Sequence, residues 1–158
     1  MKMLLAFLSL LVLAAQARVP ATFDLRVTKL EVMRMNGTPM PSRSQVVLDE
    51  PFKIRVTIKN DGPKASVPGW LYYIITKDAC DVIKHDAAIP ALAPGATLSR
   101  EFTAKVHEQA GLWSIEGSIE VASPPDKDHM NNHIGLYMLH VLAHPAHKPQ
   151  HVQGGETH

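Results

Sequence analysis

Apolar and polar residues alternate along several stretches of this chain, and the alternation predicts β-strands. In residues 52–59 (FKIRVTIK) every second residue is apolar, and the residues between them are lysine, arginine or threonine. Residues 111–121 (GLWSIEGSIEV) alternate in the same way. A period of two is typical of a strand with one buried face. Residues 23–32 also alternate, but with a one-residue slip, which indicates a β-bulge.

Four further stretches complete the expected set of strands. Residues 70–76 (WLYYIIT) are apolar on both faces, which predicts a central strand covered on both sides or one that faces a partner. Residues 98–106 follow Pro94-Gly95, which predicts a type II turn before that strand. A last apolar run, 134–141, follows a polar linker with adjacent prolines. A short strand around Val82 completes the seven, and residues 46–48 are a candidate for an additional short strand in the long connection before residue 52.

This pattern predicts an all-β fold without helices in the body of the chain. Seven short strands joined by turn residues favour a seven-stranded antiparallel immunoglobulin-like β-sandwich, and a small barrel is the alternative. The single cysteine, Cys80, excludes an internal disulfide, so the apolar core alone must hold the domain together. Trp70 and Trp113 are the two candidates to fill the centre of that core.

The N-terminus has the pattern of a signal peptide. Lys2 precedes an apolar run from Leu4 to Ala15, and Ala15-Gln-Ala17 is a small-x-small cleavage site. The run is shorter than the roughly 20 residues that span a bilayer, although a retained anchor is the alternative. We therefore expect a signal peptide at 1–17, a folded domain at 18–142 and a periplasmic or secreted location.

The charge balance of the chain bears on the class of partner. The chain has 16 Lys and Arg against 15 Asp and Glu, and removal of Lys2 leaves 16 − 1 = 15 against 15. This balance gives no reason to expect nucleic acid or an anionic membrane surface as partner. No other segment is long and apolar enough to span a membrane.

Several local motifs occur together in an order that matches a known family. They are Asp24-Leu25, the strand and turn at 52–62 (FKIRVTIKNDG), the turn at 92–97 (LAPGAT), the strand start at Gly111 and the paired Asn131-Asn132. From Phe23 to Leu142 the chain resembles the CARDB domain, an immunoglobulin-like module of bacterial and archaeal exported and cell-surface proteins. His129 and Met130 stand where the family usually has acidic residues. The resemblance implies binding or spacing and names no ligand.

The residues favour binding over catalysis. The chain has no Gly-x-Ser-x-Gly turn and no phosphate-cradling loop, and Cys80 has no neighbouring base in the sequence. We expect a non-catalytic binding or adhesion-type module that recognises an envelope or extracellular protein or glycan. An open sheet edge is one possible binding surface. Trp70, Tyr72 and Tyr73 are the expected anchors, since aromatic residues dominate binding hot spots.

Histidine and methionine suggest an alternative function, the binding or delivery of copper, zinc or nickel in the periplasm. Imidazole and thioether groups are ligands for these metals, and a tail at 143–158 without enough apolar residues to fold should be disordered. Met33 and Met35 would lie on one face if that segment were extended. The competing interpretation is a solvated polar tail. The candidate ligands are Met33, Met35, His129, His133, His140, His144, His147, His151 and His158.

The linker before the last strand has two interpretations. Oxygen atoms of Asp126, Asp128, Asn131 and Asn132 are suitable ligands for a hard cation such as calcium. Their spacing fits no EF-hand, and the same side chains also cap backbone groups in turns. We favour capping.

Overall fold

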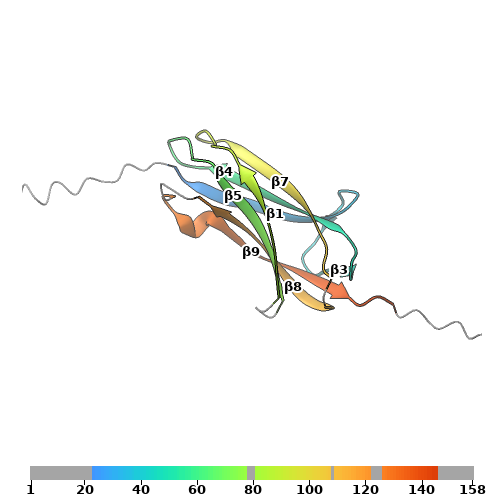
Figure 1. The fold of residues 1–158 in the computed structure, drawn as a ribbon. Coiled ribbons are helices and arrows are strands. Elements are labelled where there is room, and N and C mark those ends of the chain that lie inside the picture. The colour runs from blue at the N-terminus through green and yellow to red at the C-terminus, as the bar shows by residue number, and fades with distance from the viewer. Residues whose placement is uncertain (1–22, 78–80, 108, 122–125, 146–158) are drawn as a thin grey trace, which may run out of the picture.

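A computed structural model describes residues 23–77, 81–107, 109–121 and 126–145 and shows two β-sheets packed face to face (Figure 1). The expected signal peptide, Cys80 and the tail from residue 146 lie outside these residues. The elements in chain order are β1 (Leu25–Arg34), β2 (Pro39–Met40), β3 (Ser44–Val47), β4 (Phe52–Asn60), β5 (Gly69–Lys77), β6 (Asp81–Ile89), β7 (Thr97–Ala104), β8 (Gly111–Glu120), the 3₁₀ turn η1 (His129–Asn132) and β9 (His133–Leu142).

The two-sheet sandwich confirms the expected fold class and excludes the barrel. One sheet has the order β2-β1-β4-β7, and the other has the order β3-β9-β8-β5-β6. The expected count of seven strands is too low, because β2 and β3 add two short strands in the connection after β1. The sandwich is also not wholly antiparallel, since β3 pairs with β9 in parallel. That pairing joins segments almost 100 residues apart in the chain, so local alternation does not reveal it.

The core consists of the inward-facing residues of both sheets. Strand β4 buries every second residue, as its alternation predicts. Trp113 is fully buried and Trp70 is 48% exposed, so Trp113 is the tryptophan that fills the core. The largest fully buried side chains are Trp113, Tyr73, Phe23, Phe52, Leu25, Ile54, Ile58, Leu71, Ile75, Ile89, Ile115 and Leu139.

Two local predictions are confirmed by backbone geometry. The register of β1 against β4 shifts between Val27 and Lys29, which is the expected bulge. Gly95 has a φ of +75°, and the Ala96 amide donates to the Ala93 carbonyl at 3.0 Å. These are the features of a type II turn with glycine at its second central position.

Asn60, at the end of β4, is a buried polar junction between three segments. Its Oδ1 accepts from the amides of Asp24 (3.2 Å) and Gly62 (3.0 Å), and its Nδ2 donates to the carbonyls of Lys64 and Leu92 (2.8 Å each). Gly62 is required in this junction, because a Cβ there would lie 2.6 Å from the backbone of Phe23 and Asp24.

Strands β6 and β7 form the open side of the sandwich. Within the part of the chain that the structure describes, β6 pairs only with β5, and β7 pairs only with β4. Each therefore ends its own sheet, and the connection at 90–96 crosses between the sheets on this side. In the described residues no helix is long and apolar enough to cross a membrane.

Candidate functional site

The three predicted aromatic anchors lie on opposite faces of β5. Residues of a strand alternate between its two faces, and β5 turns Leu71, Tyr73 and Ile75 into the core. Trp70 and Tyr72 therefore lie on the outer face of the five-stranded sheet, where Trp70 is 48% exposed. Tyr73 is 0% exposed and cannot serve as a surface anchor, so its inclusion with the other two was wrong.

Charged side chains surround Tyr72 on that outer face. Its hydroxyl donates to Oε2 of Glu120 at 2.7 Å, and Nζ of Lys84 lies 3.9 Å from the centre of its ring. The hydrogen bond to Glu120 raises the pKa of Tyr72 to about 12. Tyr72 is thus held in one orientation beside the exposed ring of Trp70, which lies opposite Glu120 in the pairing of β5 with β8. We refer to Trp70, Tyr72 and Glu120 as the outer aromatic face.

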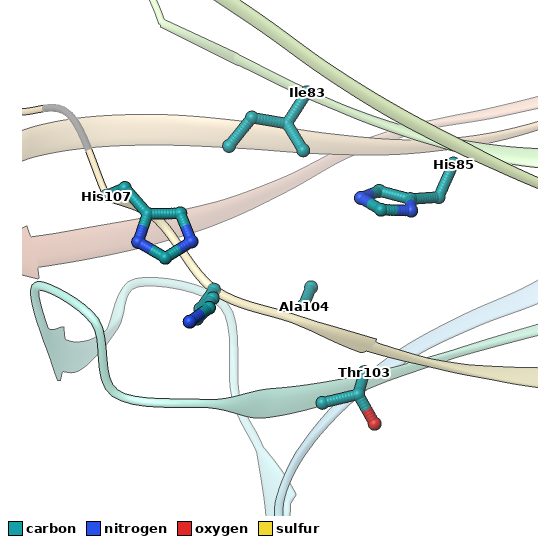
Figure 2. A pocket seen from close by; sticks show the side chains of 6 residues that line it. Ile83, His85, Thr103, Ala104 and His107 are labelled. Carbon is teal, nitrogen blue, oxygen red and sulfur yellow. The ribbon is translucent and has the colours of Figure 1, made fainter.

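A separate pocket of about 240 Å³ lies on the open side of the sandwich, between β6 and the end of β7. Figure 2 shows its labelled lining side chains, with Ile83 and His85 on β6 and Thr103 and Ala104 on β7. His107 lies at one end of the pocket, beyond the end of β7 (Figure 2). Lys105 completes the lining.

Stacked aromatic rings support one wall of this pocket, with the buried Tyr73 at their centre. The ring of His85 stacks on that of Tyr73, with 5.2 Å between ring centres and 15° between planes. Tyr73 in turn meets Phe102 of β7 edge to face at 5.0 Å. Burial raises the pKa of Tyr73 to about 12, and among the described residues its hydroxyl has no hydrogen-bond partner.

A carboxylate outside the pocket orients His107. Nδ1 of His107 is hydrogen-bonded to Oδ1 of Asp49, and Nε2 of His144 lies 3.5 Å from Oδ2 of the same carboxylate. These contacts hold the pKa of Asp49 below its ordinary value, with the His107 hydrogen bond as the main cause. Asp49 has a φ of +63°, a conformation that aspartate tolerates better than most residues.

The predicted metal ligands do not come together in the described residues. His129 lies in η1, His133 pairs with Glu116 at 3.1 Å, His140 lies beside Arg43 and Leu112, and His144 contacts Asp49. No group of three or more His, Cys, Asp or Glu side chains in this part of the chain is arranged to hold a metal ion. His147, His151 and His158 lie outside it.

The condition for the methionine prediction, a segment extended from Met33 through Met35, is not met. Met33 is 3% exposed and Met35 is 45% exposed, so the two side chains do not share a face. The reason is that β1 ends at Arg34, and the turn that leads into β2 begins at Met35.

The two aspartates of the linker cap the backbone, as expected, whereas no such cap is seen for Asn131 and Asn132 among the described residues. Asp126 accepts from the amides of Leu25 (2.8 Å) and Asp128 (3.2 Å), and Asp128 accepts from the amide of Met130 (3.1 Å). Nδ2 of Asn131 donates to Asp24 at 2.9 Å. The Oδ1 atoms of Asn131 and Asn132 are buried without a partner among the described residues.

Sequence reasoning missed the pocket residues. One signal was available, because His85 occupies an inward position of β6 between Ile83 and Ala87, where an apolar residue is the usual choice. Asp49 and His107 are 58 residues apart, and no pattern in the chain connects them.

Comparison with known proteins identifies the fold. No family model matches the chain, and no curated protein matches it. The CARDB domain of the PF1109 protein from Pyrococcus furiosus, crystallised in complex with di-metal ions, has a TM-score of 0.56 and 16% identity over 77% of this chain and 94% of that chain. The C-terminal domain of wzt has a TM-score of 0.53 and 12% identity over 77% of this chain and 75% of that chain.

A similar domain also occurs within an enzyme. The β-glucosidase EmGH1 from Erythrobacter marinus has a TM-score of 0.50 and 14% identity over 76% of this chain, but the match covers only 16% of the enzyme. Identities this low show the fold alone. The resemblance seen in the sequence is confirmed at that level: the chain has the immunoglobulin-like fold of a CARDB domain.

Proposed function

We propose that this chain is an exported, non-catalytic binding module that recognises a protein or glycan of the cell envelope or extracellular space. The outer aromatic face is the binding surface. The observation that carries the proposal is the 48% exposure of Trp70 on the outer face of the five-stranded sheet, away from the core that Trp113 fills. Trp and Tyr are enriched at binding hot spots. There the ring buries a large apolar area, and the indole N–H or the phenol O–H forms a hydrogen bond with the partner.

The neighbours of Trp70 suit both kinds of partner. The Tyr72–Glu120 hydrogen bond holds Tyr72 and Glu120 in fixed positions, so little conformational entropy is lost there when a partner binds. The carboxylate of Glu120 accepts hydrogen bonds from sugar hydroxyls or peptide amides, and the Trp70 ring covers an apolar surface. Export is supported by the signal-peptide pattern of residues 1–17.

The test is the substitution Trp70→Ala, with binding measured on an array of bacterial glycans and on a panel of purified envelope proteins. We expect the variant to lose at least about tenfold in affinity for the partner of the wild-type chain. The melting temperature should change little, because the side chain is half exposed. The array and the panel decide between a glycan and a protein.

Leu112→Ala is the matched control. Leu112 is 49% exposed, nearly the same as Trp70, and lies at the start of β8, outside the outer aromatic face. Equal binding by the wild type and both variants would refute the proposal.

The alternative function, binding of copper, zinc or nickel, is tested on the same protein by calorimetric titration with each metal. A variant with His147, His151 and His158 changed to glutamine removes the tail ligands that lie outside the described residues. Stoichiometric binding that this variant loses would favour metal handling over recognition by the outer aromatic face.

A further inference from the structure

The pocket between β6 and β7 has the chemistry of an anion site. Three of its six lining residues, His85, Lys105 and His107, can carry positive charge. No carboxylate lines it. Ile83 and Ala104 make the remaining wall apolar, so the pocket has room for an aliphatic group as well as a charge.

Both histidines are held in place before any ligand enters. His85 is stacked on Tyr73, which is itself braced by Phe102. His107 uses Nδ1 for Asp49, which leaves Nε2 free for another partner. A site whose donors are already fixed loses less conformational entropy when it binds.

The carboxylate of Asp49 does not prevent an anion from binding. It is outside the pocket lining and is shared between two imidazoles, those of His107 and His144. Lys105 has no carboxylate partner among the ion pairs of the described residues.

We propose that this pocket binds the carboxylate of a small organic acid, with Lys105, His107 and His85 as donors and Ile83 and Ala104 against its aliphatic part. A volume of about 240 Å³ is below the roughly 300–1,000 Å³ of drug-sized sites, so the ligand is small. An inorganic anion would leave the apolar wall unfilled. The acid is either a free molecule or the acidic side chain of a peptide. This site is separate from the outer aromatic face and does not depend on the proposed function.

The test is binding of glutarate to the full chain. Binding is measured by calorimetry and by the NMR signals of the histidine ring protons. Glutaramide, its neutral diamide, tests the need for charge, and phosphate tests the need for the aliphatic part. A capped Ala-Glu-Ala peptide tests the second source of the carboxylate. We expect glutarate or the peptide to shift the His85 and His107 signals and to bind about tenfold more tightly than glutaramide or phosphate.

Two variants test the residues. Lys105→Met and His85→Gln should each weaken binding about tenfold, whereas the matched controls Lys64→Met and His129→Gln, which change residues outside the pocket, should not. Because His85 packs on Tyr73, its variant is also checked for an unchanged melting temperature. Lys105 is exposed, so its variant should fold normally. Equal binding of glutaramide and glutarate, tighter binding of phosphate, or unchanged affinity in Lys105→Met would overturn the proposal.

Discussion

At the scale of single residues, two tyrosines differ in the surroundings of their hydroxyl groups. Tyr73 is fully buried, and its hydroxyl has no partner among the described residues. The hydroxyl of Tyr137 lies 2.7 Å from the carbonyl oxygen of Met40 and also within hydrogen-bond distance of that of Pro41. A buried hydroxyl without a partner destabilises the folded state, whereas a bonded one stabilises it.

The substitutions Tyr73→Phe and Tyr137→Phe should therefore differ in their effect on the free energy of unfolding. We expect Tyr73→Phe to leave the free energy of unfolding unchanged or raise it by up to about 1 kcal/mol, because only an unbonded oxygen is removed. Tyr137→Phe should lower it by about 1 kcal/mol. Urea denaturation of both variants measures the difference. A clear loss of stability in Tyr73→Phe would show that its hydroxyl has a partner.

Only part of this residue-level detail was predictable. The side-chain period of two placed the residues of β4 correctly, because a strand with one buried face exposes every second residue. The same rule places Trp70 and Tyr73 on opposite faces of β5 but does not say which face lies inside, since both faces are apolar. Only the packing against Phe102 and His85 shows which face lies inside.

At the scale of elements, the linker before β9 holds the first strand as well as its own turn. Asp126 is buried, and its Oδ2 accepts from the amide of Leu25, the first residue of β1, 101 residues away in the chain. Asp128 is exposed, and among the described residues its side chain bonds only within the turn, to the amide of Met130. The two aspartates are close in the sequence but differ in their structural role.

Asp126→Ala should therefore destabilise the domain more than Asp128→Ala. Loss of Asp126 leaves the Leu25 amide buried without a partner, at a cost of about 1–3 kcal/mol. Loss of Asp128, the exposed cap, should lower the free energy of unfolding by less than about 1 kcal/mol. Thermal unfolding gives the ranking, and hydrogen exchange at the Leu25 amide should be faster in Asp126→Ala alone. An equal loss in the two variants would contradict this ranking.

At the scale of the whole molecule, Asp49 connects three segments that lie far apart in the sequence. It follows β3, His107 follows β7, and His144 follows β9. Backbone hydrogen bonds support the junction. The Asp49 amide donates to the Val106 carbonyl, and the Leu48 amide donates to the Leu142 carbonyl, both at 2.9 Å.

The substitution Asp49→Asn tests this junction and predicts a dependence on pH. Asparagine also tolerates a positive φ, so the change removes charge without backbone strain. The pKa of Asp49 is lowered from 3.8 by its bond to His107. Its contribution to stability is therefore present above pH 3.8 and is lost as the pH falls through the lower folded value.

We expect the wild type to melt at a slightly higher temperature than Asp49→Asn at about pH 6 and at the same temperature at about pH 2. The difference should be small, because the pair is about half exposed. Glu116→Gln is the control, since Glu116 contacts a single histidine, His133. A melting difference that does not vary with pH would exclude the charge of Asp49 as its cause.

The sequence by itself determined the class of fold, most strands, the bulge in β1, the turn at Pro94-Gly95 and the caps of the linker. These features depend on local rules, namely the period of two, the preferences of proline and glycine, and the reach of short polar side chains. Such rules need only neighbouring residues.

The tertiary structure decided which surfaces exist. The parallel pairing of β3 with β9, the outward position of Trp70 and the pocket shared by His85, Lys105 and His107 all depend on how distant strands pair. In particular, β6 and β7 bring their side chains together only because each is the last strand of its own sheet on the same side of the sandwich. Long-range pairing sets that arrangement, and no local pattern encodes it.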